Sequence, residues 1–291
     1  MDNLRGILFV IAAMAGFTIE DVFIKKLSQD LPVGQILIWL GIGSGLIFAV
    51  LARVGGHRLI ERRLCKPIYV WRAVCEALAA MAFATSLSLV DLSVVASVFQ
   101  ATPLVITMGA ALFLGEKVGW RRWSAIIIGF VGVLMIIRPG LDGFDPSAIL
   151  VLVSVFFVAI RDLITRQIDS SVASTVISFQ GFAAIVPAGL ALLLITPQPV
   201  SAMTSAHSMM MLGGVLFGAF GYYGIVRAMR IGDAAVVTPF RYTRLLFSLS
   251  VGFVVFNERP DLMTLAGAAL IIATGLFTFL RERHLAKTGI G

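Results

Sequence analysis

The sequence has little charge, little cysteine and little histidine, and each shortage excludes a class of protein. Only 13% of its 291 residues are charged, about half the share usual in a soluble domain. The two cysteines, Cys65 and Cys75, are too few for a disulfide framework, and we interpret both as free thiols. The three histidines fall in predicted loops or the tail (His57, His207 and His284). We therefore expect no metal site and no other cofactor.

The sequence also lacks the motifs of ATP-driven pumps and of zinc hydrolases, since neither GxxxxGK[ST] nor HExxH occurs. Its net charge of +7 does not predict nucleic-acid binding, because the basic residues lie in short gaps between apolar runs rather than in one patch. The remaining composition is 59% hydrophobic, with a mean hydropathy of +0.98. These values favour a chain that is surrounded by lipid.

Ten apolar runs are long enough to cross a bilayer, whose hydrocarbon core of about 30 Å needs roughly 20 residues of helix. They cover residues 4–24, 33–53, 69–89, 93–114, 120–138, 146–166, 172–195, 208–229, 234–256 and 261–281. Proline and glycine mark several of the breaks between them, as they do where helices end. The sequence predicts an all-α polytopic membrane protein with ten transmembrane helices.

The chain contains an internal duplication. Segments 91–116 and 233–258 each begin with Asp, continue as an apolar run and end with Glu, and they lie 142 residues apart. We expect two repeats of five helices, covering residues 1–143 and 144–291. Because five is odd, the second repeat must be inverted in the membrane. Inverted repeats are typical of secondary transporters, whose substrate site lies between the halves near the midplane.

Lysine and arginine predict the orientation, because they are enriched in cytoplasmic segments. Sixteen of them fall in the segments on one side and four on the other. This distribution predicts a multi-pass protein of the inner (cytoplasmic) membrane with both termini in the cytoplasm. Residues 8–15 resemble a short signal peptide, but Asp2 offsets the charge of Arg5, so we expect a retained first helix.

Ionisable residues inside apolar runs are costly and mark functional sites. Glu20 and Asp21 in the first run align with Arg161 and Asp162 in the sixth, at an offset of 141. One interpretation makes these residues gates or coupling-proton carboxylates at opposite membrane faces. The other places them at the headgroups as ordinary helix ends.

The third run contains Glu76 about 10 Å from its start. Arg72 is four residues earlier, so the two can pair on one helix face. One interpretation is that Glu76 forms only this local ion pair, near the cytoplasmic edge. The other is that Glu76 faces a cavity and pairs with a cation from another helix.

The ninth run carries two arginines three residues apart, Arg241 and Arg244, with Arg244 near the bilayer centre. Neither can face lipid. They are candidate anchors for an anionic or carbonyl-rich substrate. The alternative is structural neutralisation of acidic side chains in other runs (Glu20, Asp162 or Glu76).

Aromatic and amide side chains at membrane depth are the remaining candidates for substrate contact. They are Trp39, Gln100, Tyr222, Tyr223 and Tyr242. The aromatic rings can stack on a planar ligand. Ordinary packing with hydroxyl hydrogen bonds is the competing interpretation.

The fourth and ninth runs close with related motifs, LFLGE at 112–116 and VFNERP at 255–260, each followed by a glycine-spaced run. With ten runs in two halves, the chain resembles the EamA branch of the drug/metabolite transporter superfamily. Asn257 departs from the family, which usually has glycine there. The resemblance implies secondary transport through a cavity lined by runs 1, 3, 4, 6, 8 and 9.

Residues 239–247 with 258–261 also resemble a bacterial branch that includes riboflavin transporters. This resemblance implies riboflavin or a related flavin as substrate, and export of aromatic or other amino acids and metabolites is the alternative. An intramembrane transferase is a remote alternative, since its only loose nucleophile–base candidate is Cys75 beside Glu76, which face different sides of a helix. We expect no enzyme, and as partners a small-molecule substrate, membrane lipids and a coupling proton.

Overall fold

A computed structural model describes residues 2–60, 62–116, 118–141, 144–169, 171–196, 198–231 and 234–288. This part of the chain is mostly helical and contains no strand. A helix satisfies every backbone donor and acceptor within its own segment, which lipid requires because it offers no partners. The composition and the architecture therefore agree.

The helices follow one another in two similar series. The first contains α1 (Asn3–Leu27), α2 (Val33–Val54), η1 (Arg62–Cys65), α3 (Pro67–Leu89), α4 (Leu92–Phe99), α5 (Thr102–Phe113) and α6 (Trp120–Ile137). The second contains η2 (Pro146–Ala148), α7 (Ile149–Arg166), α8 (Ser174–Ile195), α9 (Ser205–Ile231), α10 (Ala234–Val237), η3 (Thr238–Tyr242), α11 (Thr243–Phe256) and α12 (Leu262–Thr288).

Nine segments of the described residues are long and apolar enough to cross a membrane, with α4 and α5 counted together. They confirm nine of the ten predicted runs. The one remaining run is the ninth along the chain, 234–256. It is not a single helix but is divided among α10, the 3₁₀ segment η3 and α11. Pro239 lies at this break and has no N–H to donate to the preceding turn.

The predicted run 93–114 is likewise broken, into α4 and α5, just before Pro103. The duplication relates the two breaks, because Gln100 in the first and Tyr242 at the end of η3 are 142 residues apart. Discontinuous helices of this kind build the midplane binding sites of transporters.

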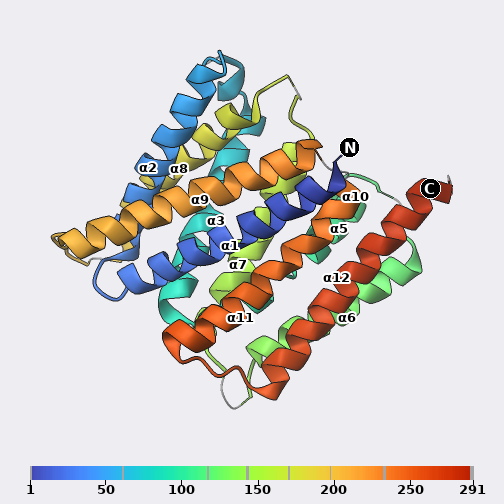
Figure 1. Cartoon of the computed structure of the whole chain (residues 1–291). Coiled ribbons are helices and arrows are strands. Elements are labelled where there is room, and N and C mark those ends of the chain that lie inside the picture. The colour runs from blue at the N-terminus through green and yellow to red at the C-terminus, as the bar shows by residue number, and fades with distance from the viewer. Residues whose placement is uncertain are drawn as a thin grey trace.

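The helices pack mainly in pairs drawn from both series (Figure 1). Helix α2 packs against α8, α6 against α12, α1 against α9 and α3 against α7. Exchanging the two series maps these pairs onto one another, since α1 with α9 corresponds to α7 with α3. The contacts of α5 with α7 and of α11 with α1 correspond in the same way.

Two of these pairs approach through glycine. A Cβ atom on Gly34 would lie 2.5 Å from the carbonyl oxygen of Gly189, where α2 crosses α8. A Cβ on Gly132 would lie 2.7 Å from the carbonyl oxygen of Gly267, where α6 crosses α12. Small residues let membrane helices pack backbone to backbone, which fixes each pair rigidly.

Helix α1 begins and α12 ends at the same end of the bundle (Figure 1). We call this the termini end and the opposite one the far end. The turn between α11 and α12 lies at the far end, as does the last turn of α1.

Candidate functional site

Asp21 of α1 and Arg244 of α11 form an ion pair in the interior. Nη2 of Arg244 donates to both carboxylate oxygens, at 3.0 Å to Oδ1 and 2.7 Å to Oδ2. Asp21 is only 2% exposed. The sequence placed Arg244 at this depth but proposed other carboxylates as its partner. The pair joins α1 of the first series to α11 of the second.

Three phenyl rings surround the Arg244 guanidinium. Its Cζ lies 5.4 Å from the ring centroid of Phe17, 5.5 Å from that of Phe83 and 5.3 Å from that of Phe99. A guanidinium is attracted to the face of an aromatic ring, more strongly once water is removed. Arg244 is therefore held on all sides by protein groups, with its charge balanced by Asp21.

A second group of charges links α3 to α7. Nη1 of Arg161 donates to Oε1 of Glu76 at 2.6 Å, and Nη2 of Arg72 donates to Oε2 of Glu76 at 3.2 Å. Arg161 also donates to Asp162, at 2.8 Å from its Nε. Glu76 therefore pairs both with Arg72 of its own helix and with Arg161 of another helix, so the local pair is not its only one.

Arg72 is buried within this group, at 2% exposed. Two further N–H groups of Arg72 are paired as well, since Nε donates to Oγ1 of Thr165 at 3.0 Å and Nη1 to the carbonyl oxygen of Ile177 at 3.5 Å. Pairing with a carboxylate and with neighbouring helices is what lets a membrane helix carry a buried arginine. Arg72 braces α3, α7 and α8.

Arg241 differs from the other interior arginines. Its side chain is exposed and forms no ion pair within the described part of the chain. Even so, it interacts electrostatically with Asp162 and with the guanidinium groups of Arg161 and Arg244. Arg241 is thus an exposed cation within electrostatic range of both ion-paired groups.

Glu20 is an acidic residue that, like Arg241, has no ion pair among the described residues. It is half-buried and lies in close contact with Gly218 of α9, where a side chain would collide with it. None of the hydrogen bonds or ion pairs found among the described residues uses its carboxylate. Glu20 lies within electrostatic range of Arg244. A carboxylate at membrane depth with no ion pair among the described residues is suited to carry a proton or to meet a ligand cation.

Tyr222 belongs to an aromatic cluster with Phe48 and Phe182. Its ring meets those of Phe48 and Phe182 edge-on, at centroid distances of 5.4 and 5.9 Å, and it lies within electrostatic reach of Arg161. Tyr242 instead turns its hydroxyl against Gly275 of α12. The two phenols therefore face different parts of the bundle.

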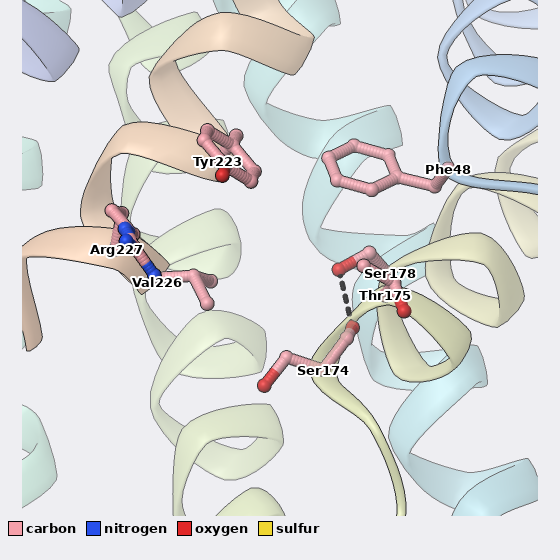
Figure 2. Close-up of a pocket in the computed structure, with 7 residues that line it drawn as sticks. All are labelled: Phe48, Ser174, Thr175, Ser178, Tyr223, Val226 and Arg227. Atoms are coloured by element: carbon pink, nitrogen blue, oxygen red, sulfur yellow. Dashed lines mark hydrogen bonds between the residues drawn. The ribbon is translucent and has the colours of Figure 1, made fainter. Parts of the chain in front are cut away.

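Tyr223 points into a small cavity between α8 and α9 (Figure 2). The other lining residues are Phe48, Ser174, Thr175, Ser178, Val226 and Arg227. The cavity measures about 70 Å³, well below the roughly 300–1,000 Å³ of small-molecule sites. It is too small to hold an organic metabolite in this conformation.

Two further candidates from the sequence lie apart from the charges. Gln100 is buried at the break between α4 and α5. Trp39 is exposed on α2, on the same stripe as Ile42, Leu46 and Val50. An apolar stripe of this spacing on a membrane helix faces lipid, so Trp39 is not brought to the other residues.

Sequence reasoning missed two residues at the far end, the half-buried Lys25 of α1 and the buried Glu258 of the turn after α11. Nζ of Lys25 lies 3.8 Å from Oε1 of Glu258, and Glu258 is only 6% exposed. The available signal was the duplication itself, because Glu258 closes the second copy.

The described residues contain no group of three or more His, Cys, Asp or Glu side chains placed to hold a metal ion. The chemistry of the interior is that of arginines, carboxylates and aromatic rings. Such groups bind and orient organic ligands.

In comparison with known proteins, one family model matches two stretches of the chain. The model of the EamA-like transporter family matches residues 4–138 and again 145–280. A riboflavin transporter of Rhizobium johnstonii is 29% identical and covers 95% of this chain and 91% of its own. An S-adenosylmethionine uptake transporter of Rickettsia prowazekii is 24% identical, covering 96% and 94%.

A pseudopaline exporter of Pseudomonas aeruginosa, CntI, is 24% identical and covers 92% of this chain and 93% of its own. One solved crystal structure, described only as that of a protein, superposes with a TM-score of 0.65 at 17% identity. It covers 96% of this chain and 98% of its own, and supports the fold alone.

Proposed function

The chain belongs to the EamA-like transporter family, and on that premise we propose that it moves a small organic metabolite across the cytoplasmic membrane by alternating access. It is a multi-pass membrane protein with transporter relatives. The proposal gives it both termini in the cytoplasm and the role of a secondary transporter rather than an enzyme. Alternating access means that a central site opens to one side at a time.

The architecture we propose is ten membrane segments in two inverted repeats, residues 1–143 and 144–291. The exchange symmetry of the helix contacts supports it, because every major pair is either its own counterpart or has one. The matched breaks in the α4–α5 and η3–α11 segments support it as well. In this arrangement the broken helices face each other at the midplane.

The proposed site rests on the charge of Arg241. This residue is a cation without an ion pair among the described residues, on a broken helix, beside interior charges that are already balanced. A guanidinium in that position is available to donate hydrogen bonds to carbonyl or anionic groups of a substrate. We assign the floor of this site to Arg244 and its three phenyl rings.

Riboflavin or a related flavin is the substrate we favour. Its planar ring presents carbonyl groups to Arg241 and an aromatic face to the phenyl and phenol rings. Riboflavin transporters of Rhizobium johnstonii and Vibrio cholerae, at 29% and 26% identity, support this choice. Neither protein fixes the substrate of this chain.

A zwitterionic substrate, of the amino-acid type, is the second candidate. Arg241 and Glu20 are opposite charges that both lack partners in the described part of the chain. Such a pair suits a molecule that carries a carboxylate and a cationic group. The S-adenosylmethionine uptake transporters among the relatives are named for a substrate of this kind.

We assign proton coupling to Glu20, since Asp21 is held by Arg244. Glu76, Arg161 and Asp162 are then gating residues, because their ion pairs join α3 to α7 and must shift if these helices separate. Coupling through Glu20 predicts transport driven by a pH gradient.

The test is uptake of labelled riboflavin into proteoliposomes, with and without a pH gradient. Arg241→Gln should abolish saturable uptake, and Glu20→Gln should remove its dependence on the gradient. Arg259→Gln is the matched control, because Arg259 is exposed outside the interior. Normal riboflavin uptake by Arg241→Gln contradicts the site, whereas uptake of S-adenosylmethionine in place of riboflavin supports the zwitterion.

A further inference from the structure

At the far end, Glu258 closes the bundle from the side of α11. Its carboxylate accepts hydrogen bonds from the backbone N–H groups of Leu92 and Ser93, at 2.7 and 2.9 Å, in the first turn of α4. These are donors that a helix start leaves free. Lys25 completes the arrangement from α1.

Nζ of Lys25 donates to the carbonyl oxygens of Val90 and Leu87, at 2.6 and 3.3 Å, at the end of α3. It also lies 5.4 Å from the ring centroid of Phe256. The pair of Lys25 and Glu258 thus fastens α1, the α3–α4 turn and the end of α11 to one another. We call it the far-end latch.

The duplication gives this latch a counterpart. Lys25 corresponds to Arg166 at the offset of 141, and Glu258 corresponds to Glu116 at 142. These two residues form an ion pair as well, with Nη1 of Arg166 at 3.4 Å from Oε1 of Glu116. It lies at the termini end, where α7 ends and α5 ends. We call it the near-end pair.

The two glutamates are presented by the same backbone turn. Gly115 has φ 69° and Asn257 has φ 54°, and the next residue in each case donates its N–H six residues back. Glu116 donates to the carbonyl oxygen of Ala110 at 3.2 Å, and Glu258 to that of Gly252 at 3.0 Å. Both helices therefore end in the same way, with a positive-φ residue followed by an N–H that bonds to the carbonyl six residues earlier. The correspondence is structural as well as sequential.

The two pairs differ sharply in burial. The side chains of Lys25 and Glu258 are 14% and 4% exposed, whereas those of Arg166 and Glu116 are 54% and 47% exposed. The two ion pairs have the same charges and the same glutamate-bearing turn, but one is buried and the other is open to solvent.

We propose that the far-end latch and the near-end pair are the two gates of the transporter and that they close alternately. The inference rests on the proposed function. In this structure the far end is closed. In the opposite state Arg166 and Glu116 are buried between α7 and the end of α5, while Lys25 and Glu258 separate and take up water.

One substitution between the repeats favours the closed far end. A Cβ on Gly252 would lie 2.6 Å from Oε2 of Glu258, so only glycine admits the buried carboxylate. The corresponding residue in the first repeat is Ala110. Its methyl group prevents Glu116 from folding back as closely, which makes the near-end closure the weaker one.

The experiment measures how often the far end opens, and it needs no substrate. Ser93→Cys is the reporter, because Ser93 is 1% exposed and its hydroxyl has no hydrogen-bond partner among the described residues. The two native thiols are removed (Cys65→Ser and Cys75→Ala). Purified protein is then treated with a charged maleimide, and the rate of labelling is followed.

Glu258→Gln and Lys25→Met should each raise the labelling rate by about tenfold or more, as expected when hydrogen bonds to charged groups are lost. Gly252→Ala should do the same without changing any charge. Glu116→Gln should lower the rate, because it removes a contact of the state that is open at the far end. Lys26→Met is the matched control and should leave the rate unchanged, since Lys26 is exposed.

Unchanged labelling in folded Glu258→Gln and Lys25→Met protein, judged by gel filtration and thermal unfolding, would overturn the proposal. An increase in Glu116→Gln equal to that in Glu258→Gln would overturn it too, because the gates would not alternate. Variants that label as expected while no tested metabolite is transported would remove the proposed substrate and keep the gates. Transport with unchanged labelling would keep the proposed function and remove the gates.

Discussion

Arg161 of α7 reaches Glu76 of α3, with 2.6 Å between Nη1 and Oε1. Arg72 approaches the same carboxylate from its own helix. With Asp162 paired to Arg161, the group contains two cations and two anions and is neutral as a whole. A neutral group is what the bilayer permits at this depth, and each member depends on the others.

Glu76→Gln should therefore destabilise the protein strongly. It leaves two guanidinium groups with Asp162 as their carboxylate, and breaking a buried pair from one side costs about 3–5 kcal/mol. Thermal unfolding in detergent checks this, with Glu116→Gln as an exposed control. Equal unfolding temperatures for the two variants would mean that water reaches Glu76 and screens it.

Arg241→Gln should reduce transport without reducing stability. Because Arg241 has no ion pair among the described residues to lose, the unfolding temperature should stay the same or rise. Transport should fall by about tenfold or more, since charge-assisted hydrogen bonds to the substrate are lost. The comparison of unfolding temperature with initial uptake rate tests this, and a parallel fall in both would make Arg241 structural.

Asp21 and Arg244 should behave as one unit. Asp21→Asn and Arg244→Gln each leave a buried partner with an unbalanced charge, so each should destabilise by several kcal/mol. The double variant, which removes both charges, should recover much of that loss. A double-mutant cycle on thermal unfolding measures the coupling, and simple additivity would contradict the pairing.

The positions of nine of the ten predicted membrane segments could be predicted from the sequence, because they depend on hydrophobic length. The pairing of charges could not. Asp21 and Arg244 are 223 residues apart, and nothing local distinguishes Asp21 from Glu20 as the partner. Lys25 lies just past the end of the first predicted run, and its position between the α3–α4 turn and Glu258 depends on tertiary contacts that no local pattern indicates.

The far end also contains an exposed ion pair with a clear pH dependence. The Arg138 guanidinium and the Thr264 N–H hold the pKa of Asp261 well below its ordinary value. Because the folded pKa is lowered, the contribution of Asp261 to stability is present above the unfolded pKa of about 4. It is lost as the pH falls through the folded pKa.

Asp261→Asn should therefore lower the unfolding temperature slightly and equally between about pH 5 and pH 8. The difference from wild type should shrink below about pH 4. Unfolding curves across this range check the sign. A difference that grows on acidification would contradict the lowered pKa.

Asn257 explains how the second repeat departs from the first without changing its shape. The turn needs a positive φ, which Gly115 supplies in the first copy and Asn257 supplies at 54°. Asparagine is the residue that most readily replaces glycine there.

Asn257→Gly should therefore leave stability and the position of Glu258 unchanged. Asn257→Ala should cost about 1–2 kcal/mol and loosen the far-end latch, because a β-carbon without a local hydrogen-bonding group strains the turn. Faster labelling of Ser93→Cys in Asn257→Ala than in Asn257→Gly would show that the turn, and not the asparagine side chain, holds Glu258 on α4.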